Sequence, residues 1–190
     1  AGGGGGRSAV VDGSTQLIVA GAGGGAGGTG HHVSHSTAGG GGGQYGEDGD
    51  NILYADAFGN CHGLGAQPSS PGARVECDGA GSIWTVGLAG GLNFGGDGLP
   101  WYAGLPPVEG TEGNTGGGGG DGYYGGSAGA NHSGGGGGSN YTHPTRVTDV
   151  HHEQSLGPSA PNNDDEDYIG GVAAGAASTQ GGHGLVVISN

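Results

Sequence analysis

The stretch TQLIVAGAGGGAGGTG, residues 15–30, joins a short apolar run to a series of glycines. The β-branched residues of the run favour a strand. Gly21, Gly23 and Ala26 match the G-x-G-x-x-G/A pattern of a dinucleotide-binding loop, which requires a helix directly after the glycines. The following residues have no amphipathic period and end in another glycine run, which excludes that helix. We therefore interpret the stretch as a strand that continues into an extended glycine segment.

Composition limits how such a chain can fold. Glycine supplies 56 of the 190 residues, and Leu, Ile, Val and Phe together make up about 15%, which is too few for an ordinary hydrophobic core. An ordered chain of this composition must be held largely by main-chain hydrogen bonds. Glycine permits them because it offers no side chain that would obstruct lateral contact.

Four glycine tracts have the same length, five residues each. They begin and end at Gly2 and Gly6, Gly39 and Gly43, Gly116 and Gly120, and Gly134 and Gly138. A flexible linker has no reason to repeat a fixed length, whereas a packed element does. Five residues in an extended threefold helix span about 15 Å, comparable with a typical strand. We predict a mostly β or irregular fold, in which a polyglycine II helix bundle is interlaced with a small β-sandwich and helices are almost absent; ordered irregular loops are the alternative.

Further strands are expected at residues 82–86 and 184–189, and residues 9–11 should form a hairpin with residues 16–19 around Asp12-Gly13. Residues 1–190 form a single glycine-rich domain. Within it, residues 50–107 lack a glycine pentad and are interpreted as a disulfide-bearing insertion, and residues 141–168 as an acidic surface loop. The insertion would hold an aromatic cluster of Phe58, Trp84, Phe94 and Trp101.

Cys61 and Cys77 lie 16 positions apart and favour a structural disulfide over two free thiols. Asn131 and Asn140 begin two N-x-S/T sequons, although unmodified Asn in a polar loop is the alternative. Together these features predict a secreted or cell-surface glycoprotein. Because the chain contains no Met and begins abruptly at Ala1, we expect a processed chain from which any signal peptide is missing.

The net charge of −14, with three Arg and no Lys, disfavours nucleic acid and anionic membrane surfaces as partners. No apolar stretch is long enough to span a membrane. The nine His occur without a Ser-His-Asp signature or a G-x-S-x-G elbow, so we do not expect an enzyme.

Two kinds of polar cluster are candidate metal sites. Oxygen-rich clusters of the type that binds calcium comprise Glu47, Asp48, Asp50, Asp164, Asp165 and Asp167. Histidine clusters that suit transition metals comprise His31, His32 and His35, and His151, His152 and Glu153. Solvated surface residues are the alternative for both, and no cofactor is expected apart from calcium. Tyr123, Tyr124 and Tyr141 would either stack on sugars or cap the ends of a glycine bundle.

The order of these motifs resembles a known family. A strand runs into broken glycine (QLIVAGAGGGAGG), and GGGGGQYGEDG, GGGGGDGYYGGSAG, GGGGGSNY and GGHGLVVIS follow. This is similar to the glycine-rich domain in the ectodomains of the anaplastic lymphoma kinase and leukocyte tyrosine kinase receptors. The resemblance implies a β-sandwich interlaced with a hexagonal bundle of polyglycine helices, an extracellular location and protein ligands. The family has a strand before its first glycine tract, which this sequence lacks, so that strand is either missing from the chain or supplied by another subunit.

Two functions follow from these features. The first is an extracellular structural module that associates with itself, as the repeating subunit of a surface filament, fibril or matrix. The second is an adhesin or receptor-like ectodomain that binds a protein or glycan through residues 50–107 and 141–168.

Overall fold

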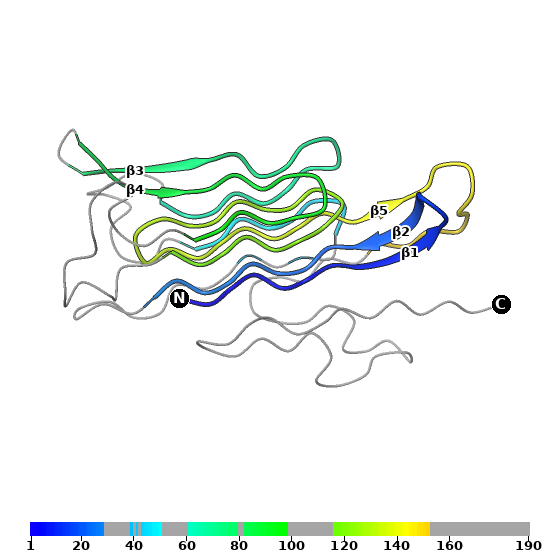
Figure 1. The fold of residues 1–190 in the computed structure, drawn as a ribbon, viewed down its shortest axis with the longest axis horizontal. Coiled ribbons are helices and arrows are strands. Elements are labelled where there is room, and N and C mark those ends of the chain that lie inside the picture. The colour runs from blue at the N-terminus through cyan, green and yellow to red at the C-terminus, as the bar shows by residue number, and fades with distance from the viewer. Residues whose placement is uncertain are drawn as a thin grey trace.

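The computed structural model describes residues 1–28, 39, 41, 43–50, 61–79, 82–98 and 116–152. Within these ranges there is no helix, and short strands alternate with long extended stretches. The strands are β1 (Ser8–Asp12), β2 (Thr15–Ala20), β3 (Val75–Gly79), β4 (Ser82–Gly87) and β5 (Tyr141–Thr142). The prediction of small β elements with much irregular structure and little helix is confirmed for this part of the chain. Figure 1 shows the extended stretches lying side by side, with β1, β2 and β5 at one end and β3 and β4 toward the other.

The predicted hairpin forms from β1 and β2, which pair antiparallel with Ser8 opposite Ala20. Gly13 and Ser14 make the turn after Asp12, and Gly13 has a φ of 58°, a left-handed conformation that costs glycine little. β5 pairs with the other side of β2, so the strand order is β1-β2-β5. The central position of β2 accounts for the burial of Val19, which is 1% exposed.

A second hairpin consists of β3 and β4, with Cys77 opposite Thr85. β4 confirms the strand predicted at residues 82–86. The strand predicted at residues 184–189 lies outside the described residues.

Residues 133–139, which we call the central segment, donate main-chain hydrogen bonds to three neighbours in turn. The N–H groups of Gly134, Gly135 and Gly136 donate to the carbonyl oxygens of Asp50, Gly25 and Ser127, at 3.2, 2.9 and 2.9 Å. The N–H groups of Gly137, Gly138 and Ser139 donate to the carbonyl oxygens of Glu47, Ala22 and Tyr124, at 2.8, 2.8 and 3.0 Å. The acceptors thus belong to three stretches, residues 47–50, 22–25 and 124–127, which are used in the same order twice. The bond direction therefore repeats every three residues. A β-strand repeats every two, so the central segment is not part of a sheet.

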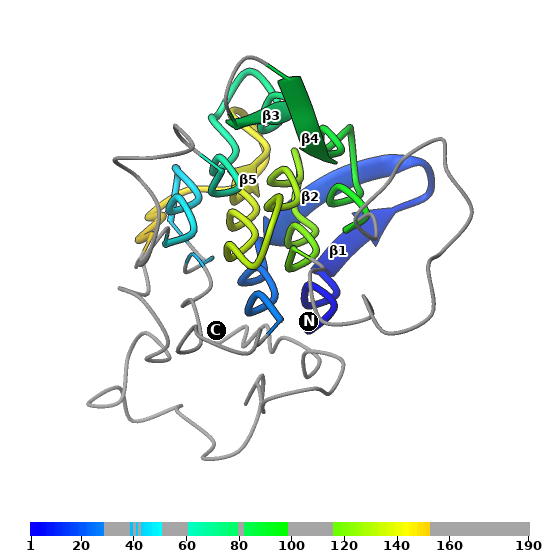
Figure 2. The same cartoon turned by 90° about the vertical axis from the view of Figure 1, so that its left-hand side faces the viewer.

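The carbonyl groups of the central segment accept bonds from three further stretches. Gly117 and Gly120 donate to Ser133 and Gly136, Gly63 and Ala66 donate to Gly134 and Gly137, and Gly39 donates to Gly135. The central segment is thus bonded to six neighbouring stretches. All of its residues are buried, and main chain surrounds them in place of side chains. Figure 2 shows the neighbouring stretches as narrow loops of chain packed beside one another.

The same three-residue spacing occurs away from the centre. Gly118 and Asp121 donate to Gly2 and Gly5, while Ala128 and Gly125 donate to Leu88 and Gly91. Residues 118–121 run parallel to residues 2–5, because donor and acceptor numbers increase together. Residues 125–128 run antiparallel to residues 88–91, because the acceptor number falls as the donor number rises. Both directions are therefore compatible with this packing.

Close main-chain contact explains why glycine fills the interior. A methyl group on Gly136 would overlap the carbonyl oxygen of Leu64, and one on Gly126 would overlap the carbonyl oxygen of Gly136. Among the described residues, the buried apolar side chains are few and mostly small: Val19, Cys61, Ala66, Val75, Cys77, Ala128 and Ala130. This agrees with the expectation that main-chain hydrogen bonds replace an ordinary apolar core.

The described parts of residues 50–107 are not set apart from the glycine stretches. Gly72 donates to Gly125 and Gly96 donates to Gly126, each at 2.9 Å. The aromatic cluster expected for this region is not supported at Phe94, which is 57% exposed. Phe58 and Trp101 lie outside the described residues. The interpretation of residues 50–107 as an insertion stays a prediction.

Substituting alanine at two adjacent glycines tests the packing. A methyl group on Gly24 would overlap the carbonyl oxygen of Gly135, whereas one on Gly23 would lie 3.3 Å from the carbonyl oxygen of Gly39. We expect Gly24→Ala to lower the free energy of unfolding by about 2–3 kcal/mol, as in an overpacked core. Gly23→Ala should change it by less than about 1 kcal/mol, because lost unfolded-state entropy offsets the tight contact. Urea unfolding measures both, and equal losses would contradict this account.

Candidate functional site

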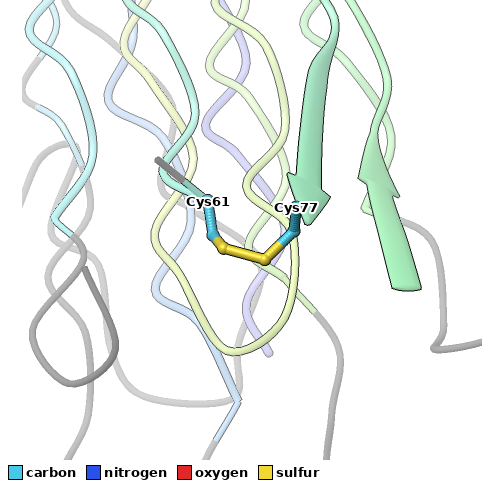
Figure 3. Close-up of a disulfide and its surroundings, with 2 residues drawn as sticks. All are labelled: Cys61 and Cys77. Atoms are coloured by element: carbon cyan, nitrogen blue, oxygen red, sulfur yellow. A yellow bond between two sulfur atoms is a disulfide. The ribbon is translucent and has the colours of Figure 1, made fainter. Parts of the chain in front are cut away.

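The predicted disulfide between Cys61 and Cys77 is confirmed, and Figure 3 shows it at one end of the glycine stretches. It joins the stretch that begins at Cys61 to β3, with a Cα–Cα distance of 4.8 Å. Both cysteines are 1% exposed and pack with Ala130, whose N–H donates to the carbonyl oxygen of Cys61 at 2.8 Å. Because the sulfur atoms are shielded from solvent, the bond is structural rather than a reactive site.

The three predicted tyrosines come together. The rings of Tyr123 and Tyr141 are stacked, with centroids 4.1 Å apart and an interplanar angle of 12°, and Tyr124 meets Tyr123 edge to face at 5.0 Å. Burial raises the pKa of Tyr123 above its usual range, and Tyr141 and Tyr124 raise it further. Tyr123 also donates its main-chain N–H to Ser139 at 2.9 Å, where the central segment ends. Since the rings stack on each other, this arrangement favours the capping interpretation over an open sugar platform.

Beside the tyrosines lies a surface that sequence reasoning missed, the turn of residues 91–94. Its apolar side chains point outward, with Leu92 53% and Phe94 57% exposed. Asn93 has a left-handed φ of 72°, and it donates its N–H to the carbonyl oxygen of Tyr123 at 3.0 Å. Its Oδ1 accepts a bond from Gln16 Nε2 at 2.9 Å. Nothing in the sequence around Asn93 indicated that Leu92 and Phe94 would be exposed.

The first acidic cluster takes part in the glycine packing. Asp48 Oδ1 accepts a bond from the N–H of Gly65 at 2.7 Å, and Oδ2 lies 4.0 Å from His62 Nε2. The carbonyl oxygens of Glu47 and Asp50 accept bonds from the central segment. In the ranges that the structure covers, no three His, Cys, Asp or Glu side chains are grouped as metal ligands. Asp164, Asp165 and Asp167, the other predicted calcium ligands, lie outside those ranges, as do His31, His32, His35 and Glu153.

The two sequon asparagines occupy different environments. Asn131 lies in the turn that precedes the central segment and has a left-handed φ of 41°. Asn140 follows the central segment, and its Oδ1 accepts the N–H of Gly21 at 2.7 Å, where β2 passes into glycine. Asn140 Nδ2 lies 3.3 Å from His152 Nδ1. Asn140 therefore has a structural role that the sequon did not reveal.

The start of the predicted acidic loop is fixed to the β1–β2 turn. Arg146 Nη2 lies 2.6 Å from Asp12 Oδ2, an exposed ion pair. Such pairs contribute little to stability, but this one places residue 146 beside the end of β1.

Burial lowers the pKa of His152 below its usual 6.5, and His151 lowers it further.

The chain matches no protein-family model, no curated protein and no solved structure. None of the described residues belongs to a helix that is long and apolar enough to cross a membrane.

Removal of the disulfide should lower stability without changing the fold. In the chain-entropy model, a closed loop of about 15 residues contributes roughly 3 kcal/mol. We expect Cys61→Ala/Cys77→Ala to lose about this much free energy of unfolding. In the native protein, thiol-trapping reagents should label neither sulfur in the presence of mild reductant. Rapid labelling without denaturant would contradict the observed burial.

His152 should make stability dependent on pH. Because its pKa is lower in the folded state, the unfolded chain binds more protons as the solution becomes acidic. The contribution of neutral His152 is therefore present above the unfolded pKa of about 6.5 and is lost as the pH falls through the folded pKa. We expect His152→Gln to flatten the pH dependence of the urea midpoint below pH 7. An identical slope in both proteins would contradict the prediction, and NMR titration of the ring measures the pKa directly.

Proposed function

We propose that this chain is an extracellular structural glycoprotein module whose glycine tracts form polyglycine II helices, and that it is the repeating subunit of a surface filament, fibril or matrix. The observation that carries the proposal is the three-residue repeat of main-chain hydrogen bonds along the central segment. A polyglycine II helix has three residues per turn and no internal hydrogen bonds, so its N–H and C=O groups point to neighbours in three directions.

The number of neighbours also supports this proposal. The central segment donates to three stretches and accepts from three others, which suits the hexagonal bundle that the resemblance implies. Complete pairing gives a rigid interior, because each bond fixes one stretch against another. A module of this kind holds its outer surfaces at fixed positions, which is the property that a repeating structural subunit requires.

The extracellular location rests on two features. The buried disulfide is of a kind that is common in oxidising compartments, and two sequons lie at the two ends of the central segment. The acidic charge of −14 suits a module that stays soluble until it assembles. These features agree with the resemblance to the glycine-rich domains of receptor ectodomains.

A second function, an adhesin or receptor-like ectodomain, is favoured by the turn at residues 91–94. Leu92 and Phe94 expose large apolar side chains next to the stacked tyrosines. Exposed apolar groups beside aromatic rings are typical of surfaces that bind proteins or glycans. This turn lies within residues 50–107, the region in which recognition was expected.

Electron microscopy tests the two functions against each other. The structural proposal predicts filaments or regular assemblies when the full native chain is concentrated. Dispersed monomers under these conditions would contradict it. The ectodomain proposal predicts binding to a glycan array or to a protein captured from matrix, with loss of at least tenfold in affinity for Leu92→Ser/Phe94→Ser. Tyr45→Ser, which changes another exposed large side chain outside residues 50–107 and 141–168, is the matched control and should bind normally.

A further inference from the structure

One border of the glycine packing has incomplete hydrogen bonding. In residues 2–6, Gly2 and Gly5 donate to Ala26 and Gly23, at 2.8 and 2.9 Å, and their carbonyl oxygens accept from Gly118 and Asp121. No main-chain hydrogen bond joins Gly3, Gly4 or Gly6 to any described residue. The central segment, by contrast, uses all three of its donor directions. Residues 2–6 therefore leave part of their main chain available to another stretch.

The unused direction has room for a neighbour. A methyl group on Gly3 or Gly6 would meet nothing within 4 Å, whereas one on Gly4 would overlap the carbonyl oxygen of Gly119. Gly3 and Gly6 are three residues apart and so lie in one column of a threefold helix. Gly3 is exposed. This column is the glycine counterpart of an unpaired sheet edge, which readily pairs with another chain segment.

The open border continues into β1. In the order β1-β2-β5, the only described strand that pairs with β1 is β2, and Val11 on β1 is 57% exposed. Figures 1 and 2 show residues 2–6 and β1 along one margin of the described chain. We call residues 2–12 the open edge. It presents glycine first and a strand second, so a segment that covers its whole length must have the same two parts.

Residues 181–189, GGHGLVVIS, have this composition and this order. In a threefold helix, Gly181 and Gly184 share one column, and His183 points in another direction. The β-branched run that follows favours a strand. Glycine meets glycine and strand meets strand only if residues 181–189 run parallel to the open edge. In the antiparallel direction, the side chains of the strand would face the glycine column.

The chain can reach the open edge within one molecule. Residue 146 lies beside the end of β1, and the described chain ends at His152, next to Asn140. Residues 153–180 then connect to the segment, and 28 residues span up to roughly 90 Å, whereas the open edge of 11 residues is roughly 35 Å long. Intramolecular docking also has a high effective concentration.

We propose that residues 181–189 of the same chain dock in parallel along residues 2–12, completing both the glycine packing and the β1-β2-β5 sheet. This proposal rests on the open hydrogen bonds and does not depend on filament formation.

Amide hydrogen exchange on the full chain tests the proposal. The amides of Gly3 and Gly6, which share the open column, should be protected at least tenfold relative to unstructured glycine. Val187→Pro removes a strand donor and should abolish that protection, while the central segment stays protected. Ala160→Pro, within the connecting residues, is the matched control and should leave the protection unchanged. Unprotected Gly3 and Gly6 in the intact chain would overturn the proposal.

Gly3→Val provides an independent readout. If the open edge is covered, the valine blocks docking, so Gly3→Val and Val187→Pro should each lower stability and the double variant should lose little more than either. If the edge is free, Gly3→Val should be neutral and the effects should add, which would overturn the proposal. Protection that falls on dilution, with a matching dimer in sedimentation, would assign the edge to a second copy and likewise overturn docking within one chain.

Discussion

The structure depends on the pairing of buried main-chain N–H and C=O groups. In most proteins this pairing accompanies an apolar core, and the core provides the main favourable term in folding. Here the central segment is buried among other main-chain stretches, and its bonds run to six neighbours. A buried polar group without a partner would be costly, so neighbours must be present on every side for any one stretch to be stable. The glycine stretches are therefore stable only together.

This constraint explains the distribution of the remaining side chains. Positions that face another main chain are glycine, because a methyl group there would overlap a carbonyl oxygen. Where a serine occurs in the interior, its hydroxyl can add a bond, as when Ser127 Oγ accepts the N–H of Leu64 at 2.8 Å. The tyrosine stack and the buried disulfide add side-chain contacts between stretches of the packing.

The sequence predicted the parts of the fold that have local signals. The apolar run after the Asp12-Gly13 turn, the strand at Ser82 and the pairing of the two cysteines each had a recognisable pattern, and the structure contains all three. Partner choice could not be predicted, because glycine is the same at every position and carries no information on which stretch lies beside which. The exposed turn at Leu92 and Phe94 was also missed, since the exposure of an apolar side chain depends on its neighbours in space.

The glycine stretches have one further consequence for function. Since both parallel and antiparallel neighbours satisfy the hydrogen bonds, the packing places little restriction on the direction of the next stretch. Selectivity must then come from the elements that flank the glycines, because strands pair in a defined register and side chains fit only where space is left. In this chain β2 passes directly into the glycines that begin at Gly21, and β1 begins one residue after the tract that ends at Gly6. Each strand thus sets the register for the glycine stretch to which it is joined, which allows a sequence with little information in its tracts to adopt one arrangement.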